Sequence, residues 1–351
     1  MDTRMRERLA ALAEDAPTVL TPPPGLTTRA RRRAVFTATA FVVAVGVIVS
    51  GGVVGARVLT RGGRVPAAPH PVRPFDGVRG WIVVGGRQLM AVNPANPSDQ
   101  VQLTTHDGVI DSPLGWSSDG AMLLFKQWAF SNADTAPSDL YVLHADGSEV
   151  QLTHDGAITG ASFSPDGSQV VYGLTTGNGS SGYASGIYVV PSMGGTPARL
   201  SHPGGPVGEP VWSPDGSRIA YVGGTVGDPS IDTVAADGSH GHTLLSLADP
   251  GFVDIAGMAW SPDGSTLVFG GMMPDIHTSQ LYSMSADGSS PLTQLTHEGS
   301  YNVWPSWSPD GTRIAYIAGQ NLTTMDPDGS HRDRLTEASP EAGSAWSPFG
   351  A

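Results

Sequence analysis

The sequence predicts an all-β protein, a six-bladed β-propeller, which follows a single transmembrane helix. Three observations lead to this fold class. One short phrase recurs six times, the two ends of the repeated region complement each other, and an uncharged stretch of 23 residues precedes that region. They divide the chain into a tail (residues 1–33), a helix (34–56), a linker (57–78) and the propeller (79–351).

The recurring phrase is Trp-Ser-Pro-Asp-Gly with small variations. Its copies begin at residues 116, 163, 212, 260, 307 and 346, which places them 47, 49, 48, 47 and 39 residues apart. Such a period is typical of repeat architectures. Pro presets the backbone for a type I turn and Gly takes the left-handed position that follows, so each copy predicts a tight hairpin.

Each unit of the array predicts four short strands. In one unit the first strand ends at Trp212, and residues 218–222 form a β-branched and aromatic run that is typical of a half-buried strand. A third strand follows after a loop of variable length, as at residues 140–143. A fourth strand ends in Leu-Thr or Leu-Ser, as at residues 152–153. Four antiparallel strands in each period are typical of a propeller blade.

The two ends of the array predict how the ring closes. The sixth copy of the phrase supplies a first strand without the other three. Residues 79–86, 89–92 and 101–104 match the second, third and fourth strands of the other units. One strand from the C-terminal end and three from the N-terminal end therefore complete a sixth blade, and a closed ring has no open sheet edge.

These repeats resemble the propeller repeats of TolB-type proteins, and also the propellers of the prolyl oligopeptidase and tricorn protease groups. The resemblance covers residues 79–351 and rests on the spaced copies of Trp-Ser-Pro-Asp-Gly. It implies a six-bladed scaffold, on which many functions are found. Residues 1–78 do not resemble the additional N-terminal domain of TolB-type proteins. The resemblance alone therefore does not imply that this chain has the role of TolB-type proteins.

Residues 34–56 carry no charge and are rich in Val and Ala. A helix of this length spans the hydrocarbon core of a bilayer, which is about 30 Å thick. Arg29 and residues 31–33 lie directly before it and outweigh the basic residues after it, which predicts a cytoplasmic N-terminus and an extracytoplasmic propeller. We expect a single-pass protein of the plasma (inner) membrane. The alternative is a cleaved signal peptide and a secreted protein, but the apolar stretch is longer than a signal peptide needs.

The tail before this helix contains a short amphipathic stretch at residues 3–16, which Pro17 ends. It is either a marginal helix or a docking site for a cytoplasmic partner. A short helix, a Pro-rich linker and an arginine cluster before one membrane span resemble the layout of membrane proteins associated with alternative sigma factors.

Charge and composition exclude several classes of function. Residues 1–78 hold 11 basic and 5 acidic side chains, whereas the rest of the chain holds 8 basic and 27 acidic ones. An acidic propeller repels nucleic acid, so we expect no nucleic-acid partner. The chain has no cysteine, which excludes disulfides, zinc–cysteine sites and a thiol nucleophile.

The two faces of the ring are expected to differ. The Asp-Gly turns gather on one face, where we expect Asp to accept hydrogen bonds from its own turn rather than to bind calcium. Longer, dissimilar loops emerge on the other face, where recognition is expected. The candidates to contact a protein, peptide or glycan there are Trp128, Phe130, Tyr183, His277, Trp304, His106, His154, His202, His297, Glu209 and Asp254.

Four of these candidates are histidines that follow the fourth strands at equivalent positions, residues 106, 154, 202 and 297. A ring of histidines could bind a metal, but the rotation between blades keeps equivalent side chains apart, so we expect no metal. No Gly-x-Ser-x-Gly elbow occurs, and Gly-x-Gly-x-x-Gly at residues 177–182 lacks a following helix, so we expect no hydrolase triad and no cofactor.

The sequence therefore favours a non-catalytic propeller that binds or senses a partner. One alternative is a hydrolase or lyase with its site in the loop-rich mouth of the ring, where Glu209 and Asp254 would have to lie at a defined separation. The other is a secreted, TolB-like component of an envelope complex.

Overall fold

A computed structural model describes residues 74–129, 137–154, 156–175, 185–201, 207–225, 228–246, 251–273, 278–298, 301–338 and 343–348. The predicted tail and transmembrane helix, and the linker up to residue 73, lie outside the described residues. No helix in the described part of the chain has the length and hydropathy to span a bilayer.

The described residues form 24 strands in six four-stranded antiparallel sheets. Three of these sheets are β4 (Val109–Trp116), β5 (Met122–Ala129), β6 (Ser138–His144) and β7 (Glu149–Gln151); β8 (Ile158–Phe163), β9 (Gln169–Leu174), β10 (Gly186–Pro191) and β11 (Ala198–Ser201); and β12 (Gly208–Trp212), β13 (Arg218–Thr225), β14 (Asp228–Ala235) and β15 (His242–Ser246).

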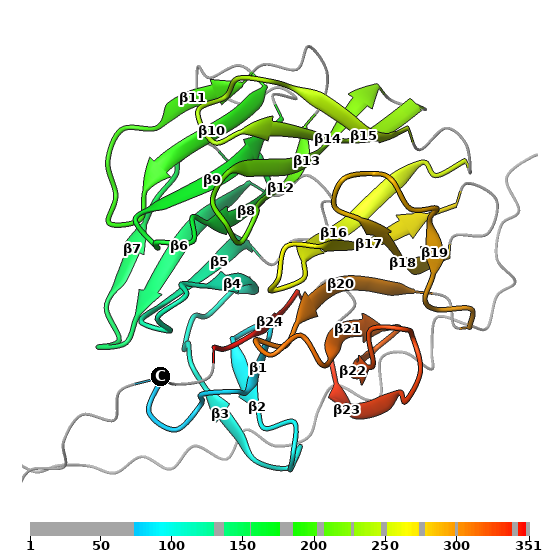
Figure 1. Ribbon diagram of the computed structural model, residues 1–351. Coiled ribbons are helices and arrows are strands. Elements are labelled where there is room, and N and C mark those ends of the chain that lie inside the picture. Colours follow the sequence, from blue (N-terminus) through cyan, green and yellow to red (C-terminus); the bar gives the residue numbers. More distant parts are fainter. Residues whose placement is uncertain are drawn as a thin grey trace, which may run out of the picture. The chain divides into compact units, whose positions relative to one another are not determined.

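The other three sheets are β16 (Asp254–Trp260), β17 (Thr266–Met272), β18 (Ser279–Ser285) and β19 (Thr293–Gln294); β20 (Asn302–Trp307), β21 (Ile314–Ala318), β22 (Asn321–Met325) and β23 (Asp333–Glu337); and β24 (Ser344–Trp346), β1 (Ile82–Val84), β2 (Met90–Val92) and β3 (Gln100–Gln102). Figure 1 shows the sheets around a common axis, with the first strand of each innermost. These inner strands contact one another around the ring.

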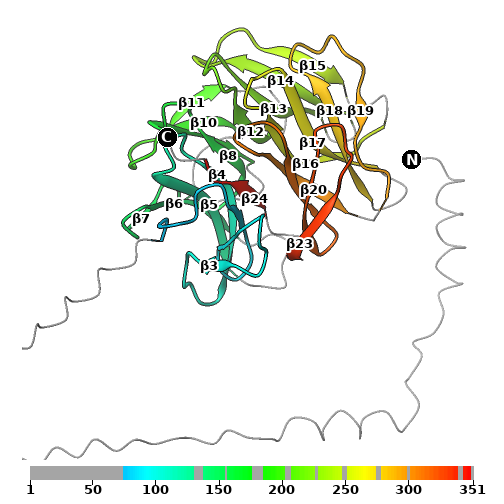
Figure 2. The same ribbon diagram turned by 60° about the horizontal axis from the view of Figure 1, so that its bottom comes forward.

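The ring closes as the sequence predicts. Strand β24 pairs with β1 in antiparallel register, with Trp346 opposite Ile82 and Ser344 opposite Val84. The indole of Trp346 donates a hydrogen bond of 3.0 Å to the Gly80 carbonyl, and the Ser347 hydroxyl donates one of 2.7 Å to the Val78 carbonyl. Figure 2 shows β24 among the inner strands of the other blades. The sixth blade is therefore built from both ends of the repeated region.

The tight turns also follow the prediction. In the turn after β12, the Ser213 hydroxyl donates to Asp215 Oδ1 at 2.6 Å, and the Ser217 amide donates to the same oxygen at 3.0 Å. Gly216 has a φ of 70°, the left-handed region that Gly adopts easily. These hydrogen bonds lower the pKa of Asp215 to about 2. The turns at Asp119, Asp166, Asp263 and Asp310 repeat this pattern.

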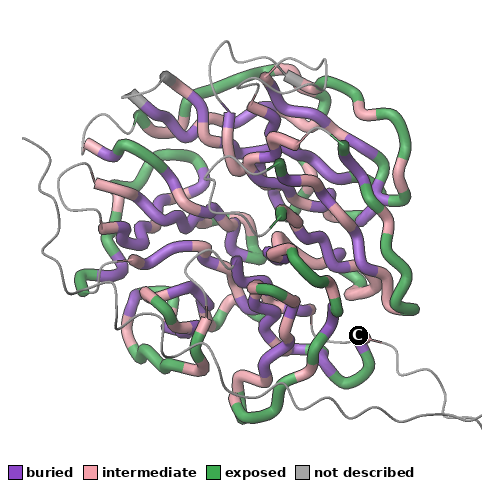
Figure 3. The backbone as a smooth tube through the Cα atoms, turned by 180° about the vertical axis from the view of Figure 1, so that it is seen from behind, coloured by how far each residue is buried: buried purple, intermediate pink, exposed green. Residues whose placement is uncertain are grey.

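The hydrophobic core lies between the blades rather than at one centre. Six clusters of buried side chains each join two neighbouring sheets; one packs Leu124 and Val142 against Tyr172 and Val190. Exposed residues gather on the turns and outer edges of the blades (Figure 3). Because each blade needs both neighbours to bury its faces, the closed ring is the unit of stability.

The Leu-Thr pair at the end of the fourth strand has a repeated structural role. Thr104, Thr153 and Thr296 each accept a hydrogen bond from an amide in the third strand or directly before it, at 2.9–3.0 Å. Each hydroxyl then donates to a buried or half-buried side chain, of which Asp111 is one at 2.7 Å. Thr104 thus links its blade to β4 of the next one, whereas Thr153 and Thr296 donate to Asp139 and Gln280 of their own blades.

Candidate functional site

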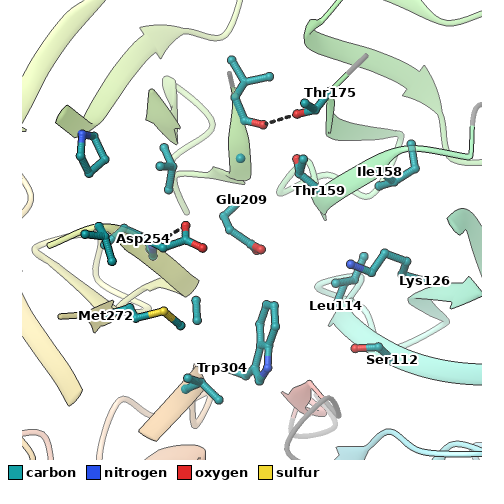
Figure 4. Close-up of a pocket in the computed structure, with 18 of the residues that line it drawn as sticks. Ser112, Leu114, Lys126, Ile158, Thr159, Thr175, Glu209, Asp254, Met272 and Trp304 are labelled. Atoms are coloured by element: carbon teal, nitrogen blue, oxygen red, sulfur yellow. Dashed lines mark hydrogen bonds between the residues drawn. The ribbon is translucent and has the colours of Figure 1, made fainter. Parts of the chain in front are cut away.

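An axial cavity of about 1050 Å³ opens between the inner strands at the end of the ring where the longer loops emerge (Figure 4). Five blades contribute to its wall. The side chains that matter for its chemistry are Lys126 and Trp128 on β5, Glu209 on β12, Asp254 on β16 and Trp304 on β20. We refer to this space, defined by these residues, as the axial cavity.

Glu209 and Trp304 occupy the same position of the repeat, three residues before its aromatic residue. A β-bulge lies there in both blades, since the register shifts between Gly208 and Val211 and between Val303 and Ser306. Bulges re-aim a side chain at the point where the ladder is interrupted. In these blades the bulge directs a carboxylate and an indole toward the axis (Figure 4).

Both residues hold a left-handed backbone, with φ of 47° at Glu209 and 56° at Trp304. A residue with a side chain pays about 1–3 kcal/mol for such a conformation. At this repeat position the chain has Gly in three other blades, Gly160, Gly257 and Gly343. Strain of this kind is common at functional sites, where the side chain serves a purpose that Gly cannot.

The glycines also make room for the two large side chains. A Cβ on Gly160 would lie 2.7 Å from Glu209 Oε2, and a Cβ on Gly257 would lie 2.8 Å from Trp304 Cα. Each glycine therefore packs against the large residue of the next blade, and the alternation of small and large residues fixes where Glu209 and Trp304 lie.

Three charged side chains share the axial cavity. Burial raises the pKa of Glu209 to about 7, the nearby charge of Lys126 opposes this rise, and Asp254 adds to it. Burial also raises the pKa of Asp254, although the Ile255 amide donates to its Oδ1 at 2.8 Å. Burial lowers the pKa of Lys126, against the attraction of Glu209. The cavity thus holds two carboxylates and one amine in a poorly solvated space.

The rest of the cavity wall is largely apolar. Leu114, Ile255 and Met272 line it, and Val253 at its rim is 43% exposed. The Lys126 ammonium lies 5.5 Å from the ring centre of Trp128, a cation–π distance. A ligand in this space would meet charged groups and aromatic faces together.

The structure brings four of the sequence-predicted candidates together in this cavity, namely Trp128, Glu209, Asp254 and Trp304. Trp128, which was expected on a loop, lies at the end of β5, and Glu209, Asp254 and Trp304 lie on the first strands β12, β16 and β20. His154 and His297 are exposed, and with His106 they are absent from the residues that line the cavity. Four candidates lie outside the described residues: Phe130, Tyr183, His202 and His277.

His106 belongs to a hydrogen-bonded network between two blades. Its Nδ1 lies 2.8 Å from Asp111 Oδ2 and its Nε2 lies 3.0 Å from Glu149 Oε2. The side chain of Asp111 is fully buried and also accepts from Gln127 at 2.9 Å. Burial alone would lower the pKa of His106, but its hydrogen bonds and the two carboxylate charges raise it. Within the described residues no group of three or more His, Asp or Glu is arranged to hold a metal ion.

Lys126 is the cavity residue that the sequence did not single out. It falls at the end of an apolar run in β5, where a single charge is commonly a solvated strand end. Aligning the units on their aromatic residue reveals Glu209 and Trp304, together with Pro113, as departures from Gly, but no comparable signal marks Lys126.

Comparison with known proteins supports the fold. No family model matches the chain. An uncharacterized protein of Agrobacterium fabrum is 29% identical over 183 residues, which are 47% of this chain and 59% of that protein. The Tol-Pal system protein TolB of Bordetella pertussis is 28% identical over 118 residues, 33% of this chain and 25% of that protein. The matches thus span less than two thirds of these relatives.

Two solved structures share the arrangement of the propeller. TolB from Acinetobacter baumannii superposes with a TM-score of 0.60 at 20% identity, covering 77% of this chain and 67% of that one. A putative TolB from Agrobacterium tumefaciens gives a TM-score of 0.55 at 22% identity, covering 75% and 96% of the two chains. With the repeats, the six sheets and the closure between β24 and β1, the chain is a TolB-like six-bladed β-propeller.

Proposed function

We propose that the propeller is a binding module that takes up an extended segment of a partner protein in its axial cavity. The observation that carries this proposal is the cavity itself, with charged and aromatic side chains around its wall and the exposed apolar side chain of Val253. Its volume of about 1050 Å³ lies just above the range for small-molecule sites, roughly 300–1,000 Å³. A peptide segment fills such a space from the open end.

The chemistry of the wall agrees with recognition of a protein. Trp304 and Trp128 are of the residue type that most often dominates binding energy at protein interfaces. Strain at Glu209 and Trp304 would have no use in a scaffold whose cavity were only structural, since Gly fits that position in three other blades. We infer that both residues are kept for a ligand.

We further propose that residues 34–56 anchor the chain in the plasma (inner) membrane, with the tail of residues 1–33 in the cytoplasm and the propeller outside it. Three of the similar proteins carry the name TolB, one of them as a Tol-Pal system protein and one as a putative TolB. A role in an envelope assembly, or in signalling across the membrane to a cytoplasmic partner of residues 3–16, is compatible with this layout.

Selection from a library of random displayed peptides tests the binding function. The purified full-length chain is the bait, and a Trp304→Ala variant is the matched bait with an altered cavity. We expect a family of related peptides that binds the wild-type chain and binds the variant at least about tenfold more weakly. No enriched family, or one that binds both baits equally, would contradict a peptide site in the axial cavity.

A second candidate function is acid–base catalysis in the same cavity. It is favoured by one observation: Glu209 and Asp254 line a single space, and the pKa of Glu209 is raised to about 7, which suits a general acid. Release of nitrophenol from a panel of chromogenic glycosides would test it. Turnover that disappears in both Glu209→Gln and Asp254→Asn would favour the enzyme over the binding module.

A further inference from the structure

We propose that the axial cavity recognises its ligand by an alkylammonium group, the side chain of a lysine in the bound segment, held by Glu209 and Asp254 against the indole of Trp304. This inference rests on the proposed function, because it names the chemistry by which the segment is selected.

The first argument is the lack of a partner for the Glu209 carboxylate. Among the residues that the structure describes, none donates a hydrogen bond to it, and no Lys, Arg or His nitrogen of that part of the chain lies within 4.0 Å of it. A half-buried carboxylate with free oxygens is costly unless donors reach it. The bulge aims this group into open cavity space, where a ligand can supply the donors (Figure 4).

The second argument is the balance of charge. Two carboxylates, Glu209 and Asp254, face one cation, Lys126, across the cavity. The Lys126 ammonium is placed near the ring of Trp128, at 5.5 Å from its centre. It therefore leaves the space between the carboxylates open, and a second positive charge there would be attracted by both.

The third argument is the aromatic and apolar wall. Trp304 shares the cavity with both carboxylates, and its ring edge is held against Gly257, where a Cβ would lie 3.0 Å from Trp304 Cε3. An indole attracts a cation placed over its ring. Met272 and Ile255 offer apolar contact for an alkyl stem. The cavity therefore matches both parts of a lysine side chain, with carboxylates for its ammonium and apolar groups for its stem.

The arrangement suits an ammonium better than a guanidinium. The two carboxylates come from different blades, β12 and β16, so they do not present one planar, paired acceptor. A guanidinium is planar and prefers a bidentate partner, whereas an ammonium directs three donors that rotate freely. In the proposed complex two of these donors bond Glu209 and Asp254, and the third remains hydrated.

Calorimetry with the full-length chain tests the inference at pH 8, where Glu209 is ionised. The probes are acetyl-Ala-Lys-Ala-amide and two uncharged analogues, with norleucine or acetyl-lysine in place of lysine. We expect the lysine peptide to bind at least about tenfold more tightly than either analogue, the range expected for a charge-assisted hydrogen bond. In Glu209→Gln the ratio of the affinities for the lysine peptide and its uncharged analogues should fall to about one. Lys126→Met, which removes the competing cation, should keep the preference for the lysine peptide.

The outcomes separate this inference from the proposed function. Equal binding of the three peptides, a preference that survives Glu209→Gln, or no binding of either the lysine peptide or cadaverine overturns the ammonium site, while selection of other peptides by the cavity would still support peptide binding. Cadaverine provides a second arm. If it competes with the lysine peptide, the ammonium site is supported; if cadaverine binds and no peptide does, the site stands and the peptide function fails. Circular dichroism of each variant confirms folding.

Discussion

Glu209 and Trp304 lie at one repeat position in two different blades, and both hold the left-handed backbone that Gly257 holds at the same position in the blade between them. The blades that bear the large side chains alternate with blades that bear Gly, so each large residue rests on a neighbour without a Cβ. At this repeat position three consecutive blades therefore share a left-handed backbone and differ in their side chains.

Replacing Glu209 tests whether its backbone is strained. We expect Glu209→Gly to be more stable than Glu209→Ala by about 1 kcal/mol, because Ala keeps the penalty of a left-handed φ and Gly does not. Urea unfolding of the two variants and the wild type measures the difference. Equal stability of the Gly and Ala variants would show that the position carries no strain.

The raised pKa of Glu209 predicts a dependence of stability on pH. Between 4.5, its ordinary value, and about 7 the folded chain binds a proton that the unfolded chain has released, so the contribution of Glu209 to stability is lost as the pH rises through this window. Lys126 and Asp254 face the same group. We expect Glu209→Gln to flatten this decline in a series of thermal melts.

His106 titrates in an overlapping range and its raised pKa also removes stability as the pH rises. The difference between wild type and Glu209→Gln therefore isolates Glu209. A difference that does not change between pH 4.5 and 7 would contradict the raised pKa.

Gly343 tests the closure of the ring. A Cβ at this position would lie 2.5 Å from the Pro113 carbonyl oxygen, across the contact between β24 and β4. We expect Gly343→Ala to lower the free energy of unfolding by about 1–3 kcal/mol, as overpacking does. Gly115→Ala is the matched control, because its Cβ would meet nothing within 4 Å. Similar losses in the two variants would argue against a tight closure at this point.

The network around Asp111 predicts that its buried side chain is costly to replace. Asp111 accepts hydrogen bonds from Thr104 and Gln127 and pairs with His106. We expect Asp111→Asn to cost about 1–3 kcal/mol, because the amide turns a donor toward other donors. Glu149→Gln, at the more exposed end of the same network, should cost less than about 1 kcal/mol. Equal costs in chemical unfolding would refute the central place of Asp111.

The proposed anchor predicts that the full-length chain fractionates with membranes, and that deletion of residues 34–56 releases it. A reporter fused after Ala351 should be active only outside the cytoplasm. A soluble product that starts near Arg57 would instead identify residues 34–56 as a cleaved signal peptide.

The fold could be predicted because its signals are local. Pro, Asp and Gly fix each turn through their own backbone, as Asp215 and Gly216 show, and the period then counts the blades. The closure followed from two incomplete ends that fit each other. Each of these signals can be read from residues close together in the sequence or by comparing one repeat with another.

The site could be predicted only in part. Glu209, Asp254, Trp128 and Trp304 were identified by their place near the longer loops, but the distance of each from the axis depends on packing between blades. Lys126 could not be predicted as a site residue. Nothing near it in sequence indicates that Glu209, on another sheet, lies across the same cavity. Convergence of residues from five blades is a property of the ring and not of any one repeat.

Strand β1 has a further consequence for how the protein reaches its native state. Its partner β24 lies more than 260 residues later, as the bond between Trp81 and Ser347, 266 residues apart, shows. Contacts between such distant segments are slow to form, because the entropy of closing a long loop is lost before strand pairing contributes any stabilisation. Until β24 arrives, β1 exposes an unpaired edge that other chains can join. The pairing of β24 with β1 therefore ends the period in which a growing chain is prone to associate with other chains.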